Sequence, residues 1–189
     1  MKLGETLYVA DRKAWRAWLS KNHGKKREVW LVYPRKHAGK PRISYADAVE
    51  EALCFGWIDS TVKRIDGDSY AQRFTPRKNT GNWSQPNVER MRRLIKLGEM
   101  TPAGLAAFKN PELLAKKQKL KIAPDVIRAL KRNPRVWKNF QRFPGGYKRI
   151  RIAYIEDRRR YGADAFEKSL RNFVKKTREN KRFAFGGVQ

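Results

Sequence analysis

Tryptophan and arginine side chains recur from Phe55 to Ser84, together with one aspartate. Guanidinium groups bind phosphates and carboxylates through paired hydrogen bonds and also stack on aromatic rings, so this combination suits an anionic small-molecule ligand of a binding protein or an enzyme. An alternative interpretation is that the aromatic side chains fill the core while Asp59 and Arg73 form a structural ion pair at a strand end. Both interpretations remain open from the sequence, and the candidate ligand-binding residues are Trp57, Asp59, Arg73, Thr75, Arg77 and Trp83.

Other kinds of chemistry find little support in the sequence. It contains no glycine-rich phosphate loop, no paired-histidine metal motif and no nucleophile with a readable base beside it. The single cysteine, Cys54, lies toward the end of an amphipathic segment, where a buried thiol is expected. One cysteine and two histidines do not make an ordinary zinc site. We therefore expect neither a cofactor nor a metal, and nothing in the sequence argues for an enzyme.

The chain is strongly basic, and the charge is uneven. Its 45 lysines and arginines against 18 acidic residues give a net charge of +27. Residues 1–112 carry 22 basic and 12 acidic residues, net +10, whereas residues 113–189 carry 23 and 6, net +17. A field of this size attracts polyanions. The candidate polyanion-binding residues are Arg90, Arg92, Arg93, Lys96, Arg149, Arg151, Arg158, Arg159, Arg160, Lys175, Lys176 and Arg178.

Several anionic partners fit this charge. DNA or RNA is one, an anionic membrane surface is another, and a basic surface that only keeps the protein soluble is the alternative to both. No groove-reading or aromatic RNA-binding signature narrows the choice. No stretch approaches the ~18 apolar residues of a transmembrane helix. Residues 1–14 lack the apolar core of a secretory signal, which predicts a cytoplasmic protein, and the oligomeric state stays open.

Patterns of apolar residues predict an α+β domain over residues 1–112, with helices and a small antiparallel sheet. Asp11 is placed to cap a first helix, and Ser44 with Asp47 resembles the capping box of a second one that closes at Gly56. Residues 28–33 are β-branched and aromatic, which indicates a strand. The runs 57–65 and 70–75 flank the turn residues 66–69 and predict a hairpin. Further helices are expected over 88–95 and 101–108.

The remaining chain shows no strand signal. Residues 113–123 are expected to form a basic connector, because lysines crowd this short segment. Beyond it, four apolar stripes with helical spacing are separated by prolines and glycines. Residues 124–189 are therefore predicted to form a small basic helical bundle.

Several ordered motifs of this chain resemble the YdeI/OmpD-associated family, which is also described as bacteriocin-protection or OmdA-like. The resemblance rests on residues 44–48, 51–59, 73–77, 83–84 and 98–104 and on the helical segment 124–173. It implies a helical C-terminal domain and a non-enzymatic role in stress or antimicrobial-peptide tolerance, and it brings no catalytic residues. A chain of charge +27 would repel a cationic peptide, so protection through an anionic target is expected instead.

Overall fold

The computed structural model describes residues 3–78, 83–109, 111–114 and 120–183. The chain divides into two compact units, the first made of Met1–Trp83 and Arg90–Leu114, the second of Ser84–Glu89 and Ala115–Gln189. The described part of the first unit combines helices with a sheet, and that of the second is helical. The predicted α+β class is therefore confirmed.

A four-stranded sheet forms the centre of the first unit. Its strands are β1 (Thr6–Tyr8), β2 (Val29–Pro34), β3 (Trp57–Arg64) and β4 (Ser69–Pro76), in the order β1-β2-β4-β3. The predicted hairpin of β3 and β4 is antiparallel, as is the pair β2 and β4. Strand β1 was not predicted, because three residues are too few to show alternation. It pairs parallel to β2 and makes the sheet mixed rather than purely antiparallel.

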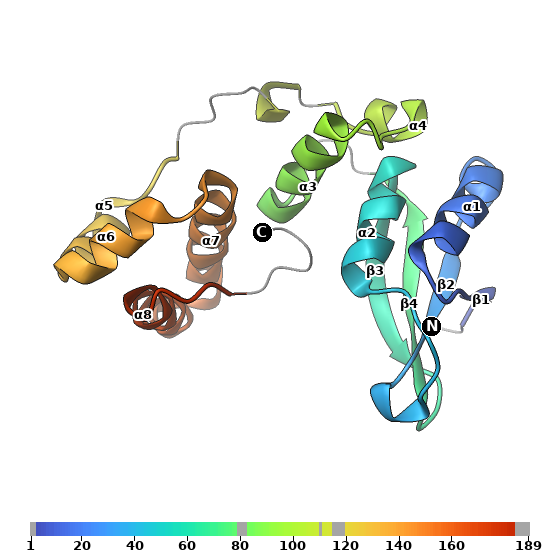
Figure 1. Cartoon of the computed structure of the whole chain (residues 1–189), viewed down its shortest axis with the longest axis horizontal. Coiled ribbons are helices and arrows are strands. Elements are labelled where there is room, and N and C mark those ends of the chain that lie inside the picture. Colours follow the sequence, from blue (N-terminus) through green and yellow to red (C-terminus); the bar gives the residue numbers. More distant parts are fainter. Residues whose placement is uncertain (1–2, 79–82, 110, 115–119, 184–189) are drawn as a thin grey trace. The chain divides into compact units, whose positions relative to one another are not determined.

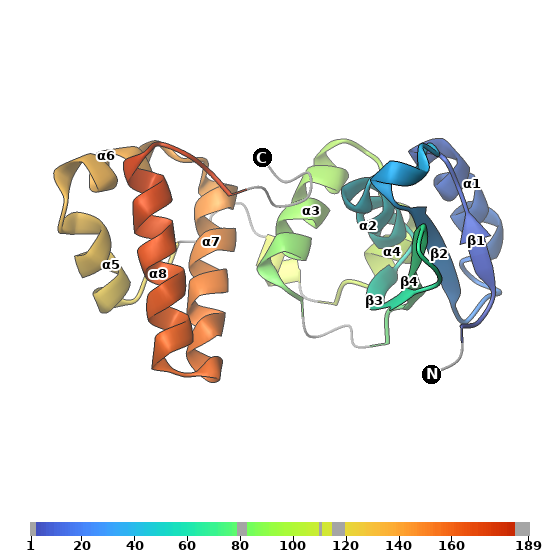
Figure 2. The same cartoon turned by 90° about the horizontal axis from the view of Figure 1, so that it is seen from below.

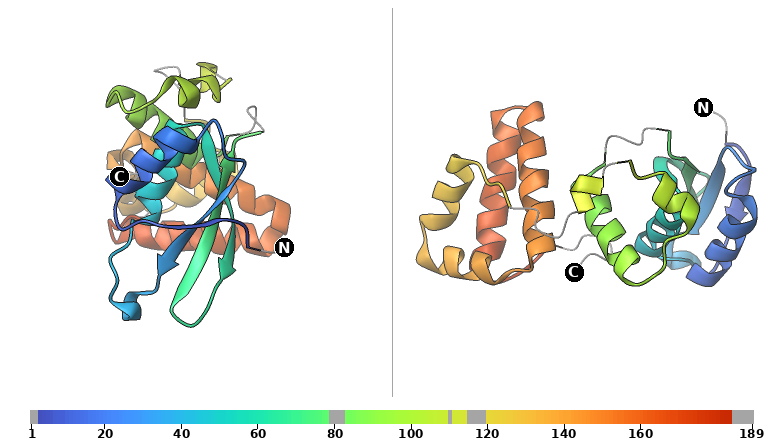
Figure 3. Two further views of the ribbon diagram at one scale, coloured as in Figure 1. Left: turned by 90° about the vertical axis from the view of Figure 1, so that its right-hand side faces the viewer. Right: turned by 90° about the horizontal axis from the view of Figure 1, so that it is seen from above.

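Two helices lie side by side on one face of this sheet, α1 (Arg12–Asn22) and α2 (Tyr45–Cys54) (Figures 1 and 3). Both predicted caps are present, since Asp11 accepts a hydrogen bond from the backbone of Ala14 and Ser44 accepts one from Asp47. Trp15 packs edge-on against Phe74 of β4 with ring centroids 5.4 Å apart. The aromatic residues of α1 therefore fix this helix on the sheet.

The remaining elements of the first unit are η1 (Lys36–Ala38), α4 (Pro102–Ala106), η2 (Pro111–Leu114) and part of α3 (Gln85–Lys96). Helix α3 is divided between the units at Glu89 and Arg90. The backbone of Gly98 just after α3 has a φ of 69°, a conformation that favours glycine and supports the predicted helix end. Of the predicted connector, residues 113–114 belong to η2, while residues 115–119 lie outside the described residues.

The second unit contains the four predicted helices, α5 (Pro124–Lys131), α6 (Pro134–Arg142), α7 (Gly145–Asp157) and α8 (Ala163–Arg178), with η3 (Arg158–Tyr161) between the last two. Helix α8 packs against each of the other three, and Figure 2 shows it running alongside α7. Apolar side chains from all four helices form one core, made of Val126, Leu130, Val136, Phe140, Phe143, Tyr147, Ile152, Ile155, Phe166 and Phe173.

Candidate functional site

Trp57 begins β3 and is part of the core. Its side chain is 1% exposed, its ring meets that of Trp18 edge-on, and its Nε1 donates a 3.1 Å hydrogen bond to the carbonyl of His23. The polar atom of this indole is therefore already satisfied by the backbone. Trp57 supports the helix-covered face of the sheet rather than presenting a free ring to a ligand.

Asp59 and Arg73 do not form the ion pair that we considered from the sequence. Asp59 lies opposite Phe74 in the register of β3 and β4, and side chains alternate between the two faces of a sheet, so Arg73 projects from the opposite face. Its Nε donates a 2.9 Å hydrogen bond to Glu28, and this contact lowers the pKa of the Glu28 carboxyl. Thr75 is half-buried and shares the face of Arg73.

On the helix-covered face, Asp59 accepts two hydrogen bonds. The hydroxyl of Tyr45 and the Nε2 of Gln72 each donate to its Oδ2 at 2.8 Å. Burial, together with the Asp59 carboxylate, raises the pKa of Tyr45 to about 12. Asp59 therefore organises neighbouring polar side chains and has no guanidinium partner on β4.

Arg77 lies just past β4 and stacks on Trp83. Its guanidinium carbon is 3.8 Å from the centroid of the indole, a cation–π contact, and burial lowers the pKa of Arg77. Trp83 also packs edge-on against Phe108. The Asp59 carboxylate also acts on the guanidinium of Arg77, so these two candidates lie near each other. Arg73 and Thr75 lie on the opposite face of the sheet, and the structure therefore does not bring all six candidate ligand-binding residues together.

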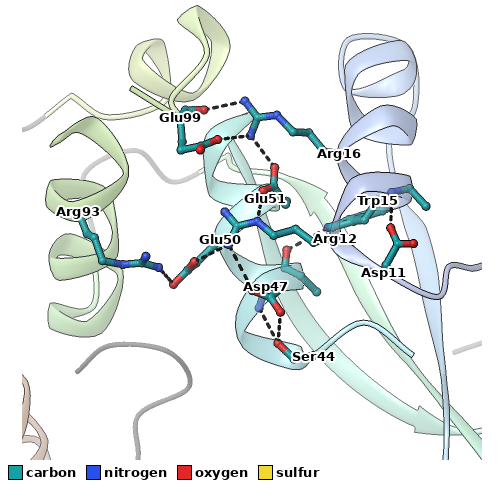
Figure 4. A network of polar contacts seen from close by, with 12 residues as sticks. Asp11, Arg12, Trp15, Arg16, Ser44, Asp47, Glu50, Glu51, Arg93 and Glu99 are labelled. Carbon is teal, nitrogen blue, oxygen red and sulfur yellow. Dashed lines mark hydrogen bonds and ion pairs between the residues drawn. The ribbon is translucent and has the colours of Figure 1, made fainter. Parts of the chain in front are cut away.

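A network of carboxylates and guanidiniums joins α1, α2 and α3, and the sequence analysis missed it (Figure 4). Glu50 and Glu51 of α2 are each 1% exposed. Glu51 accepts a 2.5 Å hydrogen bond from Arg12 and a 2.7 Å bond from Arg16, and Glu50 pairs with Arg93 of α3. A buried charge persists when it is paired, so these contacts hold the helices of the first unit together. Two adjacent glutamates beside the apolar stripe of a helix were the available signal.

The candidate polyanion contacts on α3 divide into interior and surface residues. Arg90 is 6% exposed, and burial lowers its pKa. Arg93 belongs to the carboxylate network just described. Arg92 is half-buried and Lys96 is exposed. Arg90 and Arg93 therefore serve the packing of the first unit, whereas Lys96 is accessible to a partner.

Most of the arginines predicted to bind a polyanion in the second unit have internal partners. The guanidinium of Arg149 donates to both carboxylate oxygens of Glu89, at 2.7 and 2.8 Å. Arg151 is 5% exposed, and its guanidinium carbon lies 3.9 Å from the ring centroid of Phe183. Each arginine of the 158–160 run pairs with a carboxylate, in the contacts Arg158–Asp157, Arg159–Asp125, Arg159–Glu156 and Arg160–Asp157. The most conspicuous basic run of the sequence is thus largely neutralised.

Most exposed cations lie elsewhere, on α5, α6 and α8 and in the turn between α5 and α6. Lys175 and Arg178 of the predicted set are exposed, and Lys176 is half-buried with its ammonium over Phe183. Within the described residues 120–183, the exposed basic side chains that take part in no ion pair are Lys121, Arg128, Lys131, Arg132, Arg135, Lys138, Arg142, Lys168, Lys175, Arg178 and Arg182. Apart from Lys175 and Arg178, these residues were not predicted as polyanion contacts, because most of them are single arginines and lysines on short helices, which form no visible run in the sequence.

A groove of about 570 Å³ opens among these cations. One wall is the end of α5 and the start of α6, and the other is a stripe along α8. Aliphatic side chains and exposed cations share its surface, and its lining comprises Ala129, Arg132, Asn133, Val136, Glu167, Leu170, Arg171, Asn172, Val174, Lys175 and Arg178. This groove and the charges around it are the site that the geometry assembles best.

Comparison with known families assigns both parts of the chain. Residues 119–180 match the family described as Bacteriocin-protection, YdeI or OmpD-Associated. Residues 7–107, more than half of the 189 residues, match the family described as Domain of unknown function (DUF8412). The chain therefore belongs to the DUF8412 family, and its residues 119–180 form a domain similar to the YdeI/OmpD-associated family. No match was found among curated proteins or among solved structures.

The YdeI/OmpD-associated domain corresponds to the helical part of the second unit, α5 to α8, and contains the whole groove. The resemblance seen in the sequence is confirmed for this region. The N-terminal motifs quoted for it, such as 51–59 and 73–77, lie within the DUF8412 match instead. That match also contains the carboxylate network and the stretch Trp57–Trp83.

Neither a metal-binding cluster nor a membrane-spanning helix is present in the residues that the structure describes. No three side chains of histidine, cysteine, aspartate or glutamate gather there in a way that could hold a metal ion. In the same ranges, no helix has both the length and the apolar character to span a bilayer.

Proposed function

We propose that the YdeI/OmpD-associated domain is a docking module without catalytic activity that binds an anionic macromolecule, in a cytoplasmic role related to bacteriocin protection. The observation that carries this proposal is the separation of paired and unpaired cations. The Arg158 to Arg160 run is tied to carboxylates, whereas exposed cations on α5, α6 and α8 take part in no ion pair among residues 120–183. Such cations are available to phosphates or carboxylates of a partner.

The net charge supports an indirect form of protection. A protein of net charge +27 repels a cationic peptide, so direct capture of such a bacteriocin is unfavourable. Binding to an anionic target that the peptide would otherwise occupy is consistent with both the charge and the family description. Nucleic acid and acidic protein segments both offer the required charge.

The salt dependence of binding tests this proposal. The probes are a labelled random-sequence DNA duplex and a labelled polyglutamate peptide, titrated with the full chain. Binding is expected at ~50 mM salt and should weaken steeply toward ~200 mM, because each neutralised phosphate releases counterions. Absence of binding to both probes at the lower salt concentration would overturn the proposal. Binding that does not respond to salt would also contradict it, since the attraction would not be electrostatic.

A further inference from the structure

The groove of the second unit follows one face of α8. Six of its residues on that helix are spaced as neighbours on a helix surface are: Glu167, Leu170, Arg171, Val174, Lys175 and Arg178. Asn172 also contributes to the lining from α8. From Glu167 to Arg178 the helix rises about 16 Å, so the groove is long enough for about three turns of a second helix. Its other wall is formed by residues 129–136.

The groove has an apolar floor and a basic rim. Aliphatic side chains of Ala129, Val136, Leu170 and Val174 line it, and no aromatic side chain does. Arg132, Lys175 and Arg178 add exposed cations that take part in no ion pair within residues 120–183. The fourth cation, Arg171, pairs with Glu167 at 3.0 Å. A ligand that fits this surface has apolar side chains on one face and carboxylates beside them.

Nucleic acid fits the groove less well than a protein segment does. Single strands bind proteins by stacking bases on aromatic side chains, and the lining has none. An amphipathic helix, in contrast, lays apolar residues at i, i+3, i+4 and i+7 into an apolar groove. The volume of about 570 Å³ lies within the range of ligand-sized pockets and provides room for a few inserted side chains.

We infer that the groove between α8 and the α5–α6 turn binds an acidic amphipathic helix of a partner protein. The inference rests on the proposed function, since it names the partner of the same basic surface. Leucine-like side chains of the partner would contact Leu170 and Val174. Carboxylates on the flanks of the partner helix would pair with Arg132, Lys175 and Arg178. Apolar contact then gives selectivity, and the charges give attraction.

Fluorescence anisotropy with three labelled probes tests the partner class on the full chain. The first is a designed helical peptide of about 14 residues with leucines at i, i+3, i+4 and i+7 and glutamates between them. The second has the same composition in scrambled order, and the third is polyglutamate. At ~150 mM salt, the first is expected to bind about tenfold more tightly than either of the others, the amount that one buried leucine contributes.

Matched variants locate the binding. Arg132→Gln with Lys175→Gln removes two rim charges, and Lys13→Gln with Lys21→Gln removes two exposed charges of the first unit. The rim substitutions are expected to lower the affinity for the amphipathic peptide about tenfold, and the control substitutions are expected to lower it less than about threefold. Val174→Thr keeps the side-chain shape but replaces a methyl group with a hydroxyl. It should lower the affinity for the amphipathic peptide and leave the affinity for polyglutamate unchanged. Circular dichroism confirms that each variant is folded.

The outcomes separate the two proposals. Equal binding of the amphipathic and scrambled peptides, or equal losses from the rim and control pairs, contradicts the groove inference while leaving a general electrostatic surface. The random-sequence DNA duplex that tests the proposed function provides a further comparison. If the chain binds this duplex more tightly than the amphipathic peptide, nucleic acid is the better partner and the groove inference is contradicted. Failure of every probe at ~50 mM salt overturns the proposed function itself.

Discussion

The Nη2 atom of Arg159 donates hydrogen bonds to both carboxylate oxygens of Asp125, at 3.0 and 2.8 Å, across 34 residues of sequence. Arg159 also pairs with Glu156 on its own side of the bundle. This relationship ties the start of α5 to η3. It also shows that an arginine within a conspicuous basic run can be paired with carboxylates of its own chain and contribute little to an external partner.

The Asp125–Arg159 pair should make the stability of the helical unit depend on pH. The hydrogen bond from Arg159 holds the pKa of Asp125 below its ordinary value of 3.8. The stabilisation is therefore fully present above about pH 4 and is lost as the pH falls through the lower folded-state pKa. Because the pair is solvent-exposed, Asp125→Asn is expected to cost no more than about 1 kcal/mol at pH 7.

Thermal unfolding of the wild type and Asp125→Asn between pH 2 and pH 7 measures this effect. Asparagine keeps an oxygen that can accept the hydrogen bond from the backbone of Val126, so mainly the charge is removed. The difference in melting temperature between the wild type and Asp125→Asn should vanish toward pH 2. A difference that grows toward acidic pH would contradict the assignment.

The buried carboxylate Glu51 should matter far more than the exposed Glu99, although both pair with Arg16. Glu51→Gln removes the buried carboxylate that pairs with both Arg12 and Arg16, and Arg12 then keeps only Glu50 and Asp47 as partners. This variant should lower the free energy of unfolding by about 2–3 kcal/mol. Glu99→Gln removes a partner that is 43% exposed and should cost less than about 0.5 kcal/mol. Urea unfolding followed by tryptophan fluorescence measures the free energy of unfolding of both variants. Equal losses for Glu51→Gln and Glu99→Gln would contradict the stabilising role of the buried network.

These long-range pairs mark the limit of what the sequence predicts. The caps at Asp11 and Ser44 and the end of α2 before Gly56 depend on residues within a few positions, so local patterns predict them correctly. The bond between Arg12 and Glu51 joins residues 39 apart. The separation of Asp59 from Arg73 depends on strand register, which pairs Asp59 with Phe74. Neither relation leaves a periodic signal, and for the same reason the sequence favoured the 158–160 run over dispersed residues such as Arg132 and Arg135.

Cys54 should be unreactive in the folded protein. It is fully buried, and burial raises the pKa of its thiol to about 11, so almost no thiolate is present at pH 8. A thiol-specific reagent is expected to label the native chain at least about a hundredfold more slowly than the urea-unfolded chain, because the ordinary thiol pKa and solvent access are restored on unfolding. Comparable labelling rates at pH 8 would show that Cys54 is accessible.

Gly104 should not tolerate a methyl group. A Cβ at this position would lie 2.2 Å from the carbonyl oxygen of Cys54, the same oxygen that accepts a hydrogen bond from the hydroxyl of Thr101. Gly104→Ala should therefore destabilise the first unit by about 1–3 kcal/mol. Gly67→Ala is the control, since a Cβ there meets no atom within 4 Å, and thermal unfolding should show little change. Equal melting temperatures for the two variants would contradict the packing of α4 on the end of α2.

The most direct test of the docking function compares two triple variants with the same loss of charge. One replaces the unpaired Arg128, Arg135 and Arg142 with glutamine, and the other replaces the paired Arg158, Arg159 and Arg160. The measurement is the affinity of the full chain for polyglutamate at ~50 mM salt. We predict a loss of about tenfold or more for the first variant and less than about threefold for a folded second variant. Equal losses, or a larger loss from the 158–160 variant, would contradict the claim that unpaired cations on α5 and α6 carry the docking function.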